Sequence, residues 1–194
     1  MELKTNLELK YFYKDPDPIR KILRSIGAKK ESINKQKDYF FHLPKEKNSK
    51  IPSRLKLRVS GGEQRLVFYK RPFFSAENIT PSDITILPIE NKKILYFLSK
   101  ALGVKVIVEK QRELWRKGNT VFHLDEVKGV GNVFEIEVWA RSKTLKQDQV
   151  NFERYKEKLL PCLDKIITGS NEDLVLKLKK ITKLNRTYGK KQNE

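Results

Sequence analysis

The sequence predicts an α+β fold: an eight-stranded antiparallel β-barrel with helices packed on its outside. Apolar and charged residues alternate in several segments, which is typical of strands that turn one face toward a core. The expected elements also repeat, because a strand, a helix and three further strands occur twice, although the residues of the two halves barely match. Two such halves can close one antiparallel barrel, which removes exposed strand edges.

The first half is expected to contain one helix among four strands. The strand segments are rich in alternating apolar residues and cover residues 3–13, 38–43, 54–60 and 65–70. After the first strand, Asp17 and Pro18 give the N-cap and first-turn proline typical of a helix start. Apolar residues then recur at helical spacing as far as Gly27, which predicts the end of a short amphipathic helix. Gly61 and Gly62 predict a hairpin turn between the last two strands.

The second half repeats this order. Its strand segments show the same alternation, more weakly in the first of them, and cover residues 82–88, 105–116, 119–127 and 133–140. A helix is expected over residues 91–102, between the first and second of these strands, and Gly103 ends it.

Two more helices are expected beyond the barrel. Residues 148–167 form an amphipathic pattern, and Pro161 should bend or break that helix. Ser170 and Asp173 resemble a capping box that opens the last helix. The sequence therefore places a single domain over residues 1–184.

Composition limits the class of protein. A chain of 194 residues that is 38% hydrophobic can bury one sizeable core. Its net charge of +18 predicts an anionic partner, which charge alone does not identify as nucleic acid, a membrane surface or a polyphosphate. Two His and one Cys argue against a Cys/His zinc site and an internal disulfide. The final residues, 185–194, are expected to form a basic disordered tail, which leaves nucleic acid open as a partner.

The cellular location follows from the same composition. We expect a cytoplasmic protein without a membrane partner, because the sequence has no apolar segment of about 18 residues that could span a bilayer. The single Cys suits a reducing compartment. Composition does not predict the oligomeric state.

Charged residues gather on one face of the expected strands. If helices cover the apolar outer face, the charged residues must line the interior, where an unpaired ion costs several kcal/mol. The cations are Lys10, Lys56, Arg58, Lys70, Lys110 and Arg112, and the carboxylates are Glu8, Asp125, Glu135 and Glu137. Such cations suit a polyanion of about −4 charge, whose phosphate oxygens they can bind. Clustered carboxylates suit Mg²⁺ or Mn²⁺, so a triphosphate with its metal satisfies both sets, whereas nucleic acid explains only the cations.

Several motifs resemble one known superfamily. Residues 6–10, Asn-Leu-Glu-Leu-Lys, resemble the Glu-x-Glu-x-Lys opening of the CYTH superfamily, the triphosphate tunnel metalloenzymes. That superfamily includes class IV adenylyl cyclases, thiamine triphosphatases and inorganic triphosphatases. The resemblance continues in family order through residues 55–58, 66–70 with Pro72, 109–112, 124–127, 131, 134–137 and 170–174.

The resemblance implies a role for each charged residue. Glu8, Glu135 and Glu137 would bind the catalytic metal, with Asp125 as a ligand or as support beside it. The cations that would bind the triphosphate are Lys10, Lys56, Arg58, Lys70, Lys110 and Arg112. The fold that it implies is an eight-stranded antiparallel tunnel, which agrees with the strand count reached above.

The chain departs from the family pattern at two places. Asn6 stands where the family usually has its first Glu, and Thr85 stands where the fifth strand usually has an acid, while Asp83 keeps another. These changes imply altered metal use, a different substrate or binding without turnover. His123 is interpreted as a partner of Asp125 or an interior residue, rather than as a catalytic base.

Three functions follow as expectations. The first is metal-dependent hydrolysis of inorganic tripolyphosphate, a nucleoside triphosphate or thiamine triphosphate. The second is cyclisation of ATP to cyclic AMP and pyrophosphate in the manner of class IV adenylyl cyclases. The third is binding of a polyphosphate or nucleotide without catalysis. RNA binding through the basic surface is a further, less favoured reading.

Overall fold

The computed structural model describes residues 5–44, 51–70, 82–140 and 145–191. Eight strands and four α-helices confirm the predicted α+β class and the repeated order. The strands are β1 Thr5–Phe12, β2 Lys29–Phe41, β3 Ser53–Ser60, β4 Glu63–Lys70, β5 Ser82–Ile89, β6 Val104–Lys117, β7 Thr120–Val127 and β8 Gly131–Ala140. The helices are α1 Pro16–Ser25, α2 Ile94–Leu102, α3 Leu145–Leu159 and α4 Asn171–Lys191, with a 3₁₀ turn at Leu160–Cys162.

The strands form one antiparallel sheet that closes in the order β1-β5-β4-β3-β2-β6-β7-β8. The first strand of each half pairs with the last strand of the other half, β1 with β8 and β5 with β4. The β1–β5 seam is narrow, because only Thr5 with Asp83 and Asn6 with Ser82 pair across it. The barrel is therefore continuous on most of its circumference and weakly joined along one seam.

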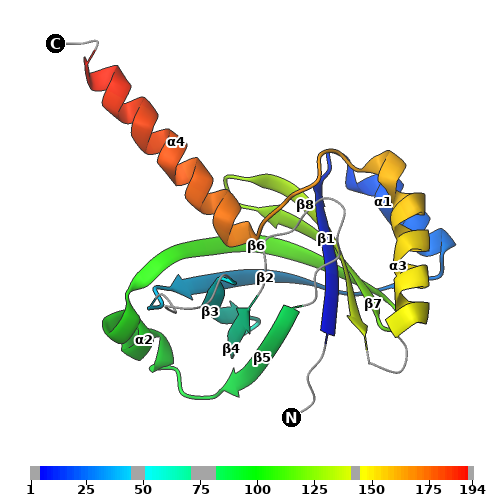
Figure 1. Ribbon diagram of the computed structural model, residues 1–194, viewed down its shortest axis with the longest axis horizontal. Coiled ribbons are helices and arrows are strands. Elements are labelled where there is room, and N and C mark those ends of the chain that lie inside the picture. The colour runs from blue at the N-terminus through cyan, green and yellow to red at the C-terminus, as the bar shows by residue number, and fades with distance from the viewer. Residues whose placement is uncertain (1–4, 45–50, 71–81, 141–144, 192–194) are drawn as a thin grey trace.

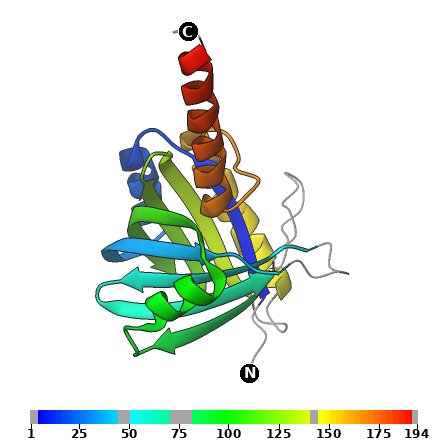
Figure 2. The same ribbon diagram turned by 90° about the vertical axis from the view of Figure 1, so that its left-hand side faces the viewer.

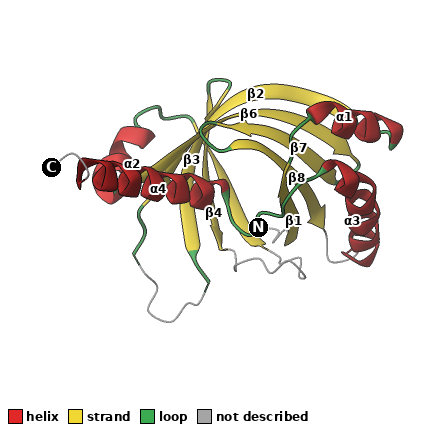
Figure 3. Cartoon of the chain, turned by 90° about the horizontal axis from the view of Figure 1, so that it is seen from above, coloured by secondary structure: helices red, strands yellow, loops and turns green. Residues whose placement is uncertain are grey.

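Helices cover the outer face of the sheet in two places, as Figure 3 shows from above. Helices α1 and α3 pack on β1, β7 and β8, and the shared core includes Ile19, Leu23, Phe122, Phe134, Ile136 and Phe152. Helix α2 covers β2, β3 and β4, where Leu98 packs against Phe41 and Leu57. The apolar side chains therefore face the helices, and the charged side chains of the same strands face inward, as the sequence predicted.

One end of the barrel is closed by the start of α4. Val175 joins a buried cluster with Val67, Val106 and Val133 from the inner face of the sheet. Ser170 caps the helix, since its Oγ accepts from the backbone N of Asp173 at 3.3 Å, and the Asp173 carboxylate accepts from the Ser170 backbone N at 2.8 Å. The predicted capping box is confirmed.

Beyond its first turns, α4 projects away from the barrel, as two views show (Figures 1 and 2). The helix continues through Lys191, whereas the sequence predicted a disordered tail over residues 185–194. In the part of the chain that the structure describes, no helix is long and apolar enough to cross a membrane.

Several expected elements have different bounds. Helix α1 begins at Pro16 and its N-cap is Asp15, whereas the sequence predicted Asp17 as the N-cap. Strand β2 begins at Lys29, whereas the sequence predicted a start at residue 38. The first nine residues of the strand are mostly exposed and polar, so they show no alternation of apolar residues from which a strand could be predicted. Helix α3 ends at Leu159 and a 3₁₀ turn that contains Pro161 follows, so the predicted break is confirmed but the predicted continuation to residue 167 is wrong. Residues 164–167 instead run beside β1, where Ile166 bridges Tyr11.

Candidate functional site

Charged side chains surround a cavity of about 130 Å³ inside the barrel. They come from β1, β2, β3, β6 and β8, and they are Glu8, Lys10, Asp38, Lys56, Arg58, Lys110, Arg112, Glu135 and Glu137. A second cavity of about 510 Å³ shares Arg58, Arg112 and Glu137 with the first and continues toward the other end of the barrel. Most of the residues that the sequence singled out are therefore brought together in one tunnel.

The first cationic group, here called the Asp38 cluster, consists of Asp38, Lys56 and Arg58. Asp38 on β2 lies directly opposite Arg58 on β3. Its Oδ1 accepts from Arg58 Nε at 2.7 Å, and its Oδ2 accepts from Arg58 Nη2 at 2.8 Å and from Lys56 Nζ at 2.9 Å. Burial would raise the Asp38 pKa, but the charges of Arg58 and Lys56 outweigh it and hold this pKa well below the usual value. Burial and the nearby Arg58 lower the pKa of Lys56 to about 7.

The second group, the Asp125 cluster, consists of Asp125, Lys110 and Arg112 and repeats the same bonds. Asp125 Oδ1 accepts from Arg112 Nε at 2.6 Å, while Oδ2 accepts from Arg112 Nη2 at 2.6 Å and Lys110 Nζ at 2.7 Å. Burial would raise the Asp125 pKa, but the charges of Arg112 and Lys110 lower it below the usual range. Each cluster therefore holds a lysine and an arginine on one carboxylate, and both side chains have N–H donors that suit phosphate oxygens.

The carboxylates gather on β1 and β8. Glu8 lies opposite Glu137, and Lys10 lies opposite Glu135. Lys10 Nζ forms an ion pair with Glu8 and a second one with Glu135 at 3.5 Å. Burial would raise the pKa of Glu135, but the charges of Lys10 and Arg112 lower it well below the usual value. Glu135 is therefore ionised at neutral pH.

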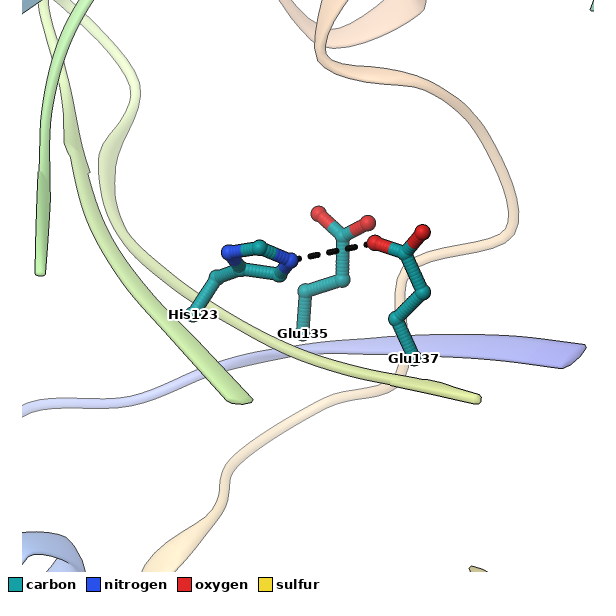
Figure 4. Close-up of side chains that lie close together, drawn as sticks. All are labelled: His123, Glu135 and Glu137. Carbon is teal, nitrogen blue, oxygen red and sulfur yellow. Dashed lines mark hydrogen bonds and ion pairs between the residues drawn. The ribbon is translucent and has the colours of Figure 1, made fainter. Parts of the chain in front are cut away.

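His123, Glu135 and Glu137 fit a divalent metal ion. Each offers one ligand atom, and these atoms lie within 4.8 Å of one another. Figure 4 shows the imidazole and the Glu137 carboxylate turned toward each other with Glu135 beside them, and His123 Nε2 lies 3.0 Å from Glu137 Oε2. Carboxylate oxygens suit Mg²⁺ and Mn²⁺, and an imidazole nitrogen suits Mn²⁺ better than Mg²⁺. Burial and the charge of Arg112 lower the His123 pKa, which favours the neutral ring that a metal requires.

The sequence predicted that His123 is a partner of Asp125 or an interior residue, and the side chain is buried in the interior. His123 lies two residues before Asp125 on the inner face of β7, but its ring contacts Glu137 on the neighbouring strand β8. In the strand register Glu137 pairs with Val121, so this contact is diagonal. The register of β7 and β8 would have predicted that His123 lies beside the two glutamates, because it pairs His123 with Glu135, the neighbour of Glu137 on the same strand face.

Lys70 lies away from the predicted site, and Asp125 fits one of its two predicted roles. Val67 and Tyr69 of β4 line the cavity, so strand alternation places Lys70 on the opposite face, away from the other cations. Asp125 is 0% exposed and both of its oxygens accept from cations, so its contacts fit the predicted role of support, through Lys110 and Arg112, better than that of a metal ligand.

The structure locates the two departures from the family pattern, Thr85 and Asn6. Ile84 and Ile86 line the cavity from β5, whereas Thr85 is exposed and pairs with Phe68, on the outer face. Thr85 therefore does not replace an inward acid, which corrects the sequence interpretation. The backbones of Asn6 and Asp83 lie at the β1–β5 seam, and their side chains lie outside the described part of the chain.

Asp38 is a site residue that the sequence did not single out. It is only 3% exposed and accepts from two of the predicted phosphate-binding cations. Its signal was present, because Asp38 and Phe40 share one face of a strand, and a lone acid beside aromatic residues suggests a paired interior charge.

Several solved structures share the fold of this chain. The PH1012 protein from Pyrococcus horikoshii OT3 is 19% identical with a TM-score of 0.70, over 87% of this chain and 98% of that one. A protein from Vibrio parahaemolyticus described as a candidate adenylate cyclase is 15% identical with a TM-score of 0.69, over 90% and 99%. HpAC1 from Hippeastrum, described as a candidate adenylyl cyclase with a dominant triphosphatase activity, is 16% identical with a TM-score of 0.53, over 87% and 91%.

At these identities the solved structures establish the shared fold. None of the curated proteins compared with this chain matches it. A family model described as the CYTH domain matches residues 4–188, which is nearly the whole sequence. The chain therefore belongs to the CYTH domain family.

Proposed function

We propose that this protein is a metal-dependent enzyme that hydrolyses a triphosphate inside its barrel. The candidate substrates are inorganic tripolyphosphate, a nucleoside triphosphate and thiamine triphosphate. One observation carries the proposal: five cations and four carboxylates line a single cavity, and no dry core would hold that set. Membership of the CYTH family supports it.

The cations would bind the substrate through its phosphate oxygens. In the free protein Arg58 and Arg112 each donate from Nε and Nη2 to a carboxylate, so their remaining guanidinium N–H groups, with Lys56 and Lys110 beside them, would bind the phosphate oxygens. In the free protein Asp38 and Asp125 hold these donors in place against their mutual repulsion. The positions are therefore set before the substrate arrives, which lowers the cost of ordering them.

The carboxylates would serve the metal and the attacking water. Glu8, Glu135 and Glu137, with His123, are the residues that would hold Mg²⁺ or Mn²⁺. When bound, the metal neutralises charge on the transferred phosphoryl group. An ionised carboxylate at this edge of the cavity can accept a hydrogen bond from the water and orient it.

A second candidate reaction is the cyclisation of ATP to cyclic AMP and pyrophosphate. Apolar residues of β4 and β5 line the same cavity, and such a surface suits a nucleoside. The 3′-hydroxyl would then attack the α-phosphate, and pyrophosphate would leave. A third candidate, binding without turnover, is motivated by Asn6 in place of the usual first Glu.

Product analysis separates these reactions. The full chain is incubated with tripolyphosphate, ATP and thiamine triphosphate under Mg²⁺ or Mn²⁺, and the products are identified by ³¹P NMR. Orthophosphate supports the hydrolase, and cyclic AMP with pyrophosphate supports the cyclase. Binding without either product supports the third candidate, and Asn6→Glu should then strengthen metal binding or restore activity.

Matched variants test whether the tunnel carries the activity. Glu137→Gln should lower kcat/KM by roughly 100-fold, because it removes a charge that holds the metal. Glu126→Gln is the control, since Glu126 is exposed on the outer face of β7. Equal activity of both variants would contradict the proposed site.

A further inference from the structure

The wall of the cavity is divided into a charged part and an apolar part. Strands β4 and β5 contribute Val67, Tyr69, Ile84 and Ile86, and β2 adds Phe40, which belongs to one buried cluster with Val67 and Tyr69 although β3 lies between the strands. None of these side chains carries a charge, whereas β1, β3, β6 and β8 contribute only charged ones. An inorganic polyanion gains nothing from apolar contact and loses hydration beside it. The apolar part therefore suits a different portion of a ligand.

The apolar part lies where the barrel is least closed. Strands β1 and β5 pair only at Thr5 and Asn6, so the two edges separate beyond these residues. Farther along β1, the segment before α4 covers the free edge, since Phe12 N donates to Lys165 O at 2.9 Å and Ile167 N donates to Lys10 O at 2.9 Å.

The remaining stretch of this seam is bordered by Glu8 on one side and Ile84 and Ile86 on the other. Ile86 is 48% exposed although it lines the cavity. The cavity can therefore be reached beside the apolar strands, and a group attached to a bound phosphate has a place to lie.

One buried amide oxygen in the lining of the cavity lacks a hydrogen-bond partner among the described residues. Asn171, the first residue of α4, lines the cavity, and its Oδ1 is buried with no hydrogen-bond partner among the described residues. Ionised phosphate oxygens only accept hydrogen bonds, so they cannot satisfy this acceptor. A hydroxyl or amino group can, and leaving such an acceptor unsatisfied disfavours any ligand without one.

We propose that the tunnel takes a triphosphate ester with an organic group, in preference to inorganic tripolyphosphate. The phosphates lie among the Asp38 and Asp125 clusters, and the organic group packs on Ile84, Ile86 and Tyr69. A hydroxyl or amino group of the ligand donates to Asn171. This inference rests on the proposed function, because it assumes that the tunnel binds triphosphates.

Charge and apolar contact predict opposite orders of affinity. Inorganic tripolyphosphate carries one more ionisable oxygen than ATP or thiamine triphosphate, so a tunnel that selects by charge alone binds it more tightly. A tunnel with a site for the organic group binds the ester more tightly instead.

The test is isothermal titration calorimetry of the full chain without metal, so that no turnover occurs. The probes are tripolyphosphate, ATP and thiamine triphosphate. We expect at least one ester to bind roughly tenfold more tightly than tripolyphosphate. Tripolyphosphate binding as tightly as both esters would overturn the inference, whereas no binding of any probe, with or without metal, would instead remove the proposed function.

Adjacent residues of β5 give a matched pair of variants. Ile86→Ser should weaken binding of the preferred ester roughly fivefold to tenfold and leave tripolyphosphate unchanged. Leu87→Ser is the control, because Leu87 is 55% exposed and lies outside the cavity lining. Asn171→Ala should likewise weaken only the ester. Equal effects of Ile86→Ser on the ester and on tripolyphosphate would contradict the inference, and thermal unfolding of each variant checks that it is folded.

Discussion

The Asp38 and Asp125 clusters have the same hydrogen bonds but differ in exposure. In the Asp38 cluster the side chains of Lys56 and Arg58 are 14% and 22% exposed. In the Asp125 cluster Lys110 and Arg112 are 2% and 8% exposed, and Arg112 has a second carboxylate partner in Glu135 at 3.2 Å. The difference suggests two tasks: the more exposed cations can exchange a carboxylate for a phosphate, while the buried ones form a fixed wall.

The two clusters also explain how the halves of the barrel can be alike in fold and unlike in sequence. In the first half the acid stands on β2 and the bases on β3, and in the second half the bases stand on β6 and the acid on β7. Asp38 opposite Arg58 is thus matched by Arg112 opposite Asp125. Corresponding strands carry opposite charges, so the interior is balanced although the residues do not repeat.

The largest expected effect comes from breaking the buried cluster. Asp125→Asn removes the carboxylate that buried Lys110 and Arg112 share and leaves Arg112 its longer contact to Glu135, and we expect a loss of about 3–5 kcal/mol in the free energy of unfolding. Urea unfolding followed by circular dichroism measures it. Glu126→Gln, a change of the adjacent exposed residue, should leave the midpoint nearly unchanged. A loss below about 1 kcal/mol for Asp125→Asn would contradict the fixed-wall interpretation.

The corresponding change in the Asp38 cluster should lower the free energy of unfolding by less and should change the affinity for tripolyphosphate. Asp38→Asn removes the partner of two cations that water can partly reach, so we expect a loss of about 1.5–3 kcal/mol. The same change frees Lys56 and Arg58, and the affinity for tripolyphosphate should rise severalfold. Calorimetry of Asp38→Asn and Asp125→Asn side by side measures the contrast. Equal stability losses, or weaker polyanion binding by Asp38→Asn, would show that exposure does not distinguish the clusters.

Strand alternation and charge placed most of this site in advance, and the exceptions have physical causes. The faces of β1, β3, β6 and β8 could be read from the sequence because apolar and charged residues alternate cleanly there. The first part of β2 could not, because a long exposed strand lacks an apolar face. Lys70 was placed with the inward-facing cations and again by the family resemblance, but its alternation with Tyr69 puts it on the other face.

Other parts of the site depend on contacts between strands. The partner of His123 follows from the register of β7 against β8, which one strand alone does not specify. The apolar wall of β5 likewise became visible only when Ile84 and Ile86 were placed beside Tyr69 in one cavity. Local patterns thus predict faces, while pairing between distant segments decides which side chains meet.

The smallest expected effect is the uptake of a proton by Lys56 when tripolyphosphate binds. Measuring it would sharpen the contrast between the Asp38 and Asp125 clusters. With a pKa of about 7, Lys56 is mostly uncharged at pH 8, although it faces Asp38 and is near Arg58 and Lys110. A bound phosphate favours the charged form and raises this pKa, so Lys56 should take up close to one proton on binding at pH 8 and almost none at pH 6, in addition to any protons that tripolyphosphate itself exchanges.

Calorimetric titration of tripolyphosphate in two buffers with different ionisation enthalpies measures that proton. Lys56→Arg keeps the positive charge but does not titrate in this range, so its uptake at pH 8 should disappear while binding remains. Uptake that persists in Lys56→Arg would assign the proton to another group, with Lys110 as the first to examine, because burial and the charge of Arg112 lower the Lys110 pKa as well. Proton exchange would then belong to the buried cluster, and the division between a fixed wall and exchangeable cations would have to be reversed.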